Sequence, residues 1–192
     1  MGEKLVKDRI KDFYNQTGWV LDEQGLTKDA CLNEDLRDVA KNYVSKCRKR
    51  IKRYLPSSGD HFLDMASGPI QYDEYLTYSD NFKKRHCVDL SELALNQAEE
   101  KIKKRGEYYC GDFLELDFDE NFFDCSVSCH TIYHIQADLQ EQAVRKLLRI
   151  TKAEQPVIII YSNPKMMINL FIKPLKLLKR VFYKNRPSNV VR

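Results

Sequence analysis

Beyond Pro56, short hydrophobic runs alternate with stretches of helical periodicity. Five runs have the length and composition of buried strands: "HFLDM", "RHCVDL", "EYYCGDF", "FFDCSVSCH" and "PVIIIYS". Helix-like segments lie between most of them, and strands joined in this way run parallel in one sheet with helices on both faces. The pattern therefore predicts an α/β fold with a doubly wound, mostly parallel sheet.

Apolar residues between Cys31 and Leu55 recur at the spacing of an amphipathic helix. This predicts one helix, ended by Pro56, with a buried stripe formed by Leu32, Leu36, Val39, Tyr43, Cys47, Ile51 and Tyr54. The run "KCRKRIKR" is typical of a nucleic-acid patch, but Cys47 and Ile51 continue the stripe. We therefore expect its basic side chains on a solvated face and no nucleic-acid partner.

A second amphipathic helix is expected after Ser91, whose hydroxyl can cap it. Leu95, Ala98 and Ile102 give this helix a stripe that faces the core, and Gly106 is expected to end it.

Composition narrows the class of protein. The 192 residues are 43% hydrophobic and 31% charged, which is typical of one soluble domain. Six cysteines without a C-x-x-C pair indicate reduced thiols of a cytoplasmic protein, with no structural metal. The net charge is +4, but residues 155–192 hold eight Lys or Arg and no acid, which indicates an anionic partner.

Small or polar residues follow four of the predicted strands. They are Asp64 with Ala66, Ser67 and Gly68, then Asp89, then Asp112, then Cys129 with His130. Parallel sheets bind ligands outside the carboxyl ends of their strands, so these residues can face one ligand. Gly68 would allow a close approach of backbone, and Asp89 could accept two ribose hydroxyls.

The nucleoside could belong to a dinucleotide or to S-adenosylmethionine. A dinucleotide fingerprint needs G-x-G-x-x-G, and Gln71 stands where its third glycine should be. This makes an NAD-dependent oxidoreductase the weaker alternative. S-adenosylmethionine has no phosphate to hold, and an acidic Asp64 suits a cationic ligand.

The segments "LDMASGPIQY", "CVDLSELAL", "GDFLELDFDENFFDCSVSCHTIYHI" and "VIIIYSNP" resemble the ordered motifs of class I S-adenosylmethionine-dependent methyltransferases of the small-molecule type 11 kind. The resemblance spans about residues 59–164 and implies a Rossmann-like core. It implies cofactor contacts by Asp64, Ala66, Ser67, Gly68, Asp89, Leu90, Asp112, Phe113 and Cys129, with Tyr14 and Trp19 as lid residues. If the acceptor needs a base, the candidates are His130, Tyr133 and His134.

The resemblance has two departures. Ala66 and Ile70 replace two glycines of the usual G-x-G-x-G, and the last two strands of the family's sheet have no counterpart before Arg192. We expect an N-terminal helical cap (1–56), a cofactor-binding core (57–164) and a basic amphipathic tail (165–192) within one domain. We expect the tail to be a lid over the acceptor, with peripheral membrane contact through residues 165–184 as the alternative.

The sequence therefore predicts a cytoplasmic methyltransferase that moves a methyl group from S-adenosylmethionine to an O or N atom of a small molecule and leaves S-adenosylhomocysteine. An anionic or lipid-linked acceptor would suit the basic tail. The alternative is a non-catalytic methyltransferase-like module whose basic tail binds a membrane or a partner. Neither the identity of the acceptor nor the oligomeric state follows from the sequence.

Overall fold

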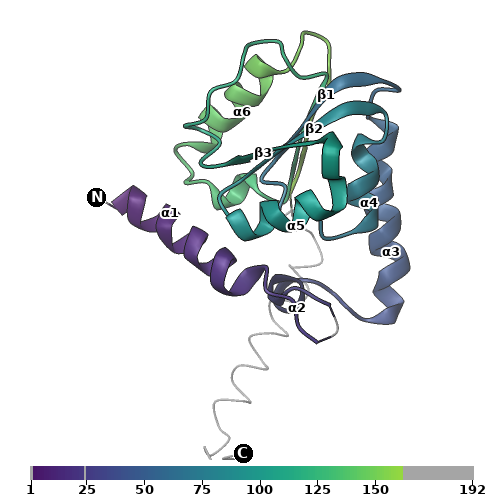
Figure 1. The fold of residues 1–192 in the computed structure, drawn as a ribbon, viewed down its shortest axis with the longest axis vertical. Coiled ribbons are helices and arrows are strands. Elements are labelled where there is room, and N and C mark those ends of the chain that lie inside the picture. The colour runs from purple at the N-terminus through teal and green to yellow at the C-terminus, as the bar shows by residue number, and fades with distance from the viewer. Residues whose placement is uncertain (1, 24, 162–192) are drawn as a thin grey trace, which may run out of the picture. The chain divides into compact units, whose positions relative to one another are not determined.

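A single parallel sheet organises the computed structural model, which describes residues 2–23 and 25–161 (Figure 1). Its strand order is β3-β2-β1-β4-β5. The strands are β1 (Gly59–Met65), β2 (Phe82–Asp89), β3 (Gly106–Cys110), β4 (Cys125–Cys129) and β5 (Val157–Ile160). Each strand lies within or overlaps one of the five predicted hydrophobic runs, which confirms the expected α/β class.

The helices lie before, between and beside these strands. They are α1 (Gly2–Phe13), the π-helical η1 (Tyr14–Gly18), α2 (Lys28–Asn33), α3 (Asp38–Lys49), η2 (Arg50–Arg53), α4 (Asp73–Leu76), η3 (Thr77–Ser79), α5 (Glu92–Ile102), η4 (Lys103–Arg105), η5 (Ile132–His134) and α6 (Gln140–Ile150). The described part of the chain belongs to one compact unit. The predicted basic tail lies outside the described residues.

Hydrophobic residues cover both faces of the sheet, as alternation along a strand requires. On one face, Leu63 of β1 packs in a cluster with Leu147 and Ile150 of α6. On the other face, Phe62 packs with Ile51 of η2 and Tyr78 of η3. Leu63 and Phe62 are both fully buried, so β1 is central in a three-layer arrangement.

The helix predicted after Ser91 is confirmed as α5. The Ser91 hydroxyl accepts a hydrogen bond from the amide of Ala94 at 3.2 Å, and the predicted stripe of Leu95, Ala98 and Ile102 is buried. The helix ends at Ile102, earlier than expected from Gly106, because Lys103 leaves the helical region with φ 57° and ψ −134°.

The prediction of one helix from Cys31 to Leu55 was wrong. The chain forms α2 and α3 with a break between them, and most of the predicted stripe is exposed. The exposed fractions are Leu32 62%, Leu36 36%, Val39 82%, Tyr43 66% and Tyr54 69%. The inward face of α3 carries Ala40, Val44 and Arg48 instead, because Arg48 stacks its guanidinium 3.2 Å from the ring centroid of Tyr72.

The strand order places a topological switch point between β1 and β4. From β1 the chain proceeds to β2 and β3 in one direction, and from β4 to β5 in the other. The carboxyl ends of β1 and β4 lie side by side, with Met65 paired to Ser128. Crevices of this kind bind ligands in open parallel sheets, and the predicted site residues follow these strands.

Candidate active site

The loop after β1 keeps an unusual backbone. Ala66, Gly68 and Ile70 all have left-handed φ angles, of 55°, 56° and 50° respectively. Only Gly68 adopts this region without steric cost, so the other two positions hold a glycine-type conformation with side chains that disfavour it. Between them the amide of Ser67 donates to the carbonyl of Val88 at 3.0 Å, which ties the loop to β2.

Asp64, at the end of β1, is paired inside the protein. Its carboxylate forms a salt bridge with Arg85 of β2, and the Arg85 side chain is 1% exposed. The Arg85 guanidinium also donates to the carbonyl of Tyr75 at 2.7 Å. The buried guanidinium of Arg85 compensates the negative charge of Asp64. Asp64 therefore has a structural role whether or not it contacts a ligand.

Asp89, at the end of β2, is held by backbone amides. Its carboxylate accepts hydrogen bonds from the amides of Gly68 and Ser91, each at 2.9 Å. Burial raises the pKa of Asp89 to about 6 despite these bonds. The carboxylate therefore links the β1 loop to the start of α5, beside the partly buried Leu90.

Asp112 follows β3 and is bound by the N-terminal helix. Lys7 of α1 lies 2.5 Å from its carboxylate, and the amide of Leu114 donates to the same carboxylate at 2.8 Å. The hydrogen bond to Asp112 raises the pKa of Lys7 above its ordinary value. The Phe113 side chain is buried in the core, so only its backbone could meet a ligand.

The segment after α1 covers the β1 loop. The indole of Trp19 lies against Gly68, where a Cβ, if the residue had one, would be 3.2 Å from Trp19 Cζ2. Tyr14 stacks on Trp19 with ring centroids 4.9 Å apart, and the Asn15 amide oxygen accepts from the Ser91 hydroxyl at 2.6 Å. The Trp19 indole Nε1 is buried and has no hydrogen-bond partner among the described residues.

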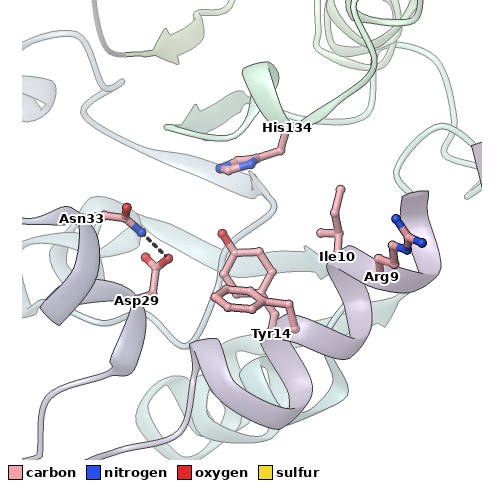
Figure 2. A pocket seen from close by; sticks show the side chains of 7 residues that line it. Arg9, Ile10, Tyr14, Asp29, Asn33 and His134 are labelled. Carbon is pink, nitrogen blue, oxygen red and sulfur yellow. Dashed lines mark hydrogen bonds between the residues drawn. The ribbon is translucent and has the colours of Figure 1, made fainter. Parts of the chain in front are cut away.

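A pocket of about 430 Å³ opens beside Tyr14 (Figure 2). It is lined by Arg9, Ile10, Phe13, Tyr14, Asp29, Asn33 and His134. Arg9 and Asp29 lie at opposite ends of it, with Tyr14 and His134 between them. The rings of Tyr14 and His134 meet edge to face at 6.4 Å.

The protonation states of the two central groups favour acid–base chemistry. Burial lowers the pKa of His134, and nearby Asp29 opposes that effect. Burial, assisted by Asp29, raises the pKa of Tyr14 to about 12. Near neutral pH the imidazole is therefore an available base and the phenol remains a hydrogen-bond donor.

The other residues predicted at the end of β4 are arranged differently. The ring of Tyr133 lies beside that of His134, with centroids 4.6 Å apart and planes tilted by 48°, and Tyr133 is 47% exposed. His130 is exposed and has a left-handed φ of 60°, and its amide donates to the carbonyl of Ile160 at 2.6 Å. Cys129 packs against the cluster around Phe62, where burial raises the pKa of its thiol.

The sequence did not reveal four contributors to this site: Lys7, Arg9, Asp29 and Asn33. Lys7 and Arg9 belong to a charge-rich amphipathic helix, where a functional cation has the same pattern as a solvated one.

Among the described residues, no group of three potential metal ligands is present, and no helix is long and apolar enough to cross a membrane.

Comparisons with known proteins identify the fold family. A family model described as "Methyltransferase domain" matches residues 63–159, about half of the chain. A search of curated protein sequences found no match. Several solved structures match the fold at low sequence identity.

One is the Haemonchus contortus phosphoethanolamine N-methyltransferase 1, solved with phosphoethanolamine and S-adenosylhomocysteine, with a TM-score of 0.67 and 16% identity over 86% of this chain. A Leishmania major S-adenosylmethionine-dependent methyltransferase has a TM-score of 0.62 and 9% identity over 80% of this chain. A putative S-adenosylmethionine-dependent methyltransferase from Methanococcus maripaludis has a TM-score of 0.51 and 20% identity over 77% of this chain. This chain spans 34%, 60% and 68% of those three proteins, respectively.

Proposed function

The chain belongs to the methyltransferase-domain family, whose cofactor is S-adenosylmethionine, and we propose that it methylates the nitrogen of a small acceptor that also carries an anionic group. The observation that carries this proposal is the pocket beside Tyr14. A cation, Arg9, and an anion, Asp29, lie at its two ends, and His134 lies between them (Figure 2). An acceptor with an ammonium and an anionic group is complementary to both ends.

The cofactor would lie along the carboxyl ends of β1, β2 and β3. Gly68 would allow its amino-acid moiety to approach the loop backbone, with Ala66 and Ser67 beside it. Asp89, whose carboxylate already accepts hydrogen bonds from the backbone of Gly68, Leu90 and Ser91, would accept the ribose hydroxyls with its remaining lone pairs. Asp64, Leu90, Asp112, Phe113 and Cys129 complete the proposed contacts, and Tyr14 and Trp19 would cover the cofactor.

The reaction would be an in-line displacement, in which the acceptor nitrogen lone pair forms a bond to the methyl carbon and the carbon–sulfur electron pair returns to sulfur. An ammonium acceptor must first lose a proton, and neutral His134 is placed to accept it. Tyr14 would position the acceptor through its phenol. Tyr133 and His130 are the other candidate bases, but of the three exposed side chains His134 is the one that lines the pocket. The Haemonchus enzyme supports an acceptor of this class, because phosphoethanolamine combines an amine and a phosphate.

A second candidate function is a non-catalytic methyltransferase-like module. The observation that favours it is the packing of the N-terminal segment. Trp19 lies on Gly68 and Lys7 forms a salt bridge with Asp112, so the chain's own side chains contact two of the proposed cofactor-binding residues. If this arrangement persists with the cofactor present, the fold would serve binding rather than methyl transfer.

The test combines cofactor binding with turnover. Calorimetric titration with S-adenosylhomocysteine should show binding that Asp89→Asn weakens at least tenfold, whereas the surface control Asp119→Asn should bind as the parent does. Radiolabelled methyl transfer should then be measured with phosphoethanolamine, ethanolamine and an uncharged alcohol. We expect transfer to the first, strong loss in His134→Gln, and an increase in KM in Arg9→Gln. Binding without transfer to any amine would support the non-catalytic module, and transfer to the alcohol alone would contradict an amine acceptor.

A further inference from the structure

One exposed line of side chains on α3 and η2 is not explained by the methyl-transfer site. Val39, Tyr43, Lys46 and Arg50 follow one another at spacings of four, three and four residues, which places them on one helical face. Arg53 follows Arg50 by three residues in the 3₁₀ turn η2, where side chains three apart are eclipsed. All five are exposed, and we call this set the α3 ridge.

The α3 ridge joins hydrophobic and cationic surface. Its N-terminal half exposes 82% of Val39 and 66% of Tyr43, and its C-terminal half carries three cations. Residues 38–54 contain seven Lys or Arg and a single acid, Asp38, which already pairs with Lys41 at 2.7 Å. Across the described ranges, no ion pair involves Lys46, Arg50 or Arg53.

The position of the ridge leaves it open. The opposite side of α3 packs on the body, where Arg48 bonds Glu34 and Ser45 bonds Glu74 of α4. Figure 1 shows α3 along one flank, beside α4 and away from α1, and no residue of the ridge is among those that line the pocket beside Tyr14. The hydrophobic residues of the ridge therefore cannot be explained as core or as part of the acceptor pocket.

We propose that the α3 ridge binds the surface of an anionic lipid bilayer. An interfacial helix with apolar residues beside Lys and Arg buries the former at the acyl boundary and places the latter among anionic headgroups. A nucleic acid could pair its phosphates with the cations and stack a base on Tyr43, but it has no apolar surface on which the aliphatic Val39 would be buried. Lipid is the partner that uses both halves of the ridge.

The experiment measures sedimentation of the full chain with phosphatidylcholine vesicles, with and without phosphatidylserine. The parent should bind only the vesicles that contain phosphatidylserine, more weakly as salt rises. Lys46→Glu/Arg50→Glu should lower the partition coefficient about 30-fold or more, since each cation near such a surface contributes about fivefold. The matched control Lys104→Glu/Arg145→Glu makes the same change of net charge on η4 and α6 and should lower it far less.

A second variant tests the hydrophobic half without changing charge. Val39→Ser/Tyr43→Ser should weaken vesicle binding severalfold and keep the parent's circular dichroism and S-adenosylhomocysteine affinity, because both residues are exposed. The proposal is wrong if the parent ignores anionic vesicles, or if both charge-reversal pairs weaken binding equally. It is also wrong if single-stranded RNA binds more tightly than the vesicles and the Val39→Ser/Tyr43→Ser variant retains that binding.

Discussion

Asp64 and Asp89 end two neighbouring parallel strands, yet the protein treats their carboxylates in opposite ways. Asp64 faces a fully buried guanidinium, whereas Asp89 accepts hydrogen bonds from backbone amides and its pKa is raised to about 6. A carboxylate paired with a buried cation mainly stabilises the fold. A carboxylate without a counter-ion is costly to ionise when buried, and its free lone pairs can accept hydrogen bonds from a ligand.

The largest expected effect comes from breaking the buried pair of Arg85 and Asp64. Arg85→Met would leave Asp64 buried beside a neutral side chain and should lower the free energy of unfolding by about 3–5 kcal/mol, measured by urea titration. Arg149→Met is the surface control, because Arg149 is 58% exposed and 3.8 Å from Glu120, and it should change stability by less than about 1 kcal/mol. The double variant Asp64→Leu/Arg85→Met should recover much of the loss. A single-variant loss no larger than that of the surface control would show that the buried pair is not structural.

The second prediction uses pH to test Asp89. If S-adenosylhomocysteine binds the ionised carboxylate, its affinity should fall by about tenfold per pH unit below about pH 6 and be flat above it. The contribution of Asp89 to folding stability changes with pH in the opposite direction to its contribution to ligand affinity. Because the folded-state pKa is raised, this group favours the folded state below its ordinary pKa and that contribution is lost as pH rises through about 6. Calorimetry from pH 5 to 8, with Asp89→Asn as the pH-independent reference, separates the two. A flat affinity profile in the parent would argue against a carboxylate–ribose contact.

Asp112 lies between these extremes, because its counter-ion comes from the cap rather than from the sheet. If Lys7 competes with the cofactor for this carboxylate, Lys7→Gln should tighten S-adenosylhomocysteine binding severalfold, about 1 kcal/mol. Lys11→Gln, an exposed change on the same helix, should have no effect. Weaker binding by Lys7→Gln would show instead that Lys7 holds the cap over the bound cofactor.

The strand ends could be predicted from the sequence because their information is local. Alternating hydrophobic runs give the strands, and the cap at Ser91 marks the start of α5 at the point where the chain leaves β2. The partners of those strand ends could not be predicted in the same way. Arg85 pairs with a residue 21 positions earlier and Lys7 with one 105 positions later, and neither spacing leaves a periodic pattern.

The error on α3 has a related cause. Periodicity shows that a helix is amphipathic, but this helix carries apolar residues on two different faces. The sequence pattern predicted that the face with Val39 and Tyr43 would be buried. The fold partly buries Val44 and Arg48 instead, because Glu34 and the ring of Tyr72 make a charged side chain acceptable on the inward face. A rule that assigns every arginine to the solvated face cannot anticipate this.

The smallest effect concerns the loop that lies between Asp64 and Asp89. Ala66 has a left-handed φ of 55°, so Ala66→Gly should raise the free energy of unfolding by about 0.5–1 kcal/mol through relief of steric strain. Ser67→Gly, at a neighbour outside the left-handed region, should lower it instead, because it adds backbone freedom to the unfolded chain and removes the hydroxyl that donates to the carbonyl of Gly68 at 3.2 Å. Ile70 shares the strained backbone, with φ 50°, but its side chain is 1% exposed, and the loss of a buried isoleucine costs more than the strain it relieves. Thermal unfolding should therefore rank Ala66→Gly above the parent and Ile70→Gly well below it. If Ile70→Gly were stabilising, backbone strain rather than side-chain burial would dominate the energy of this loop.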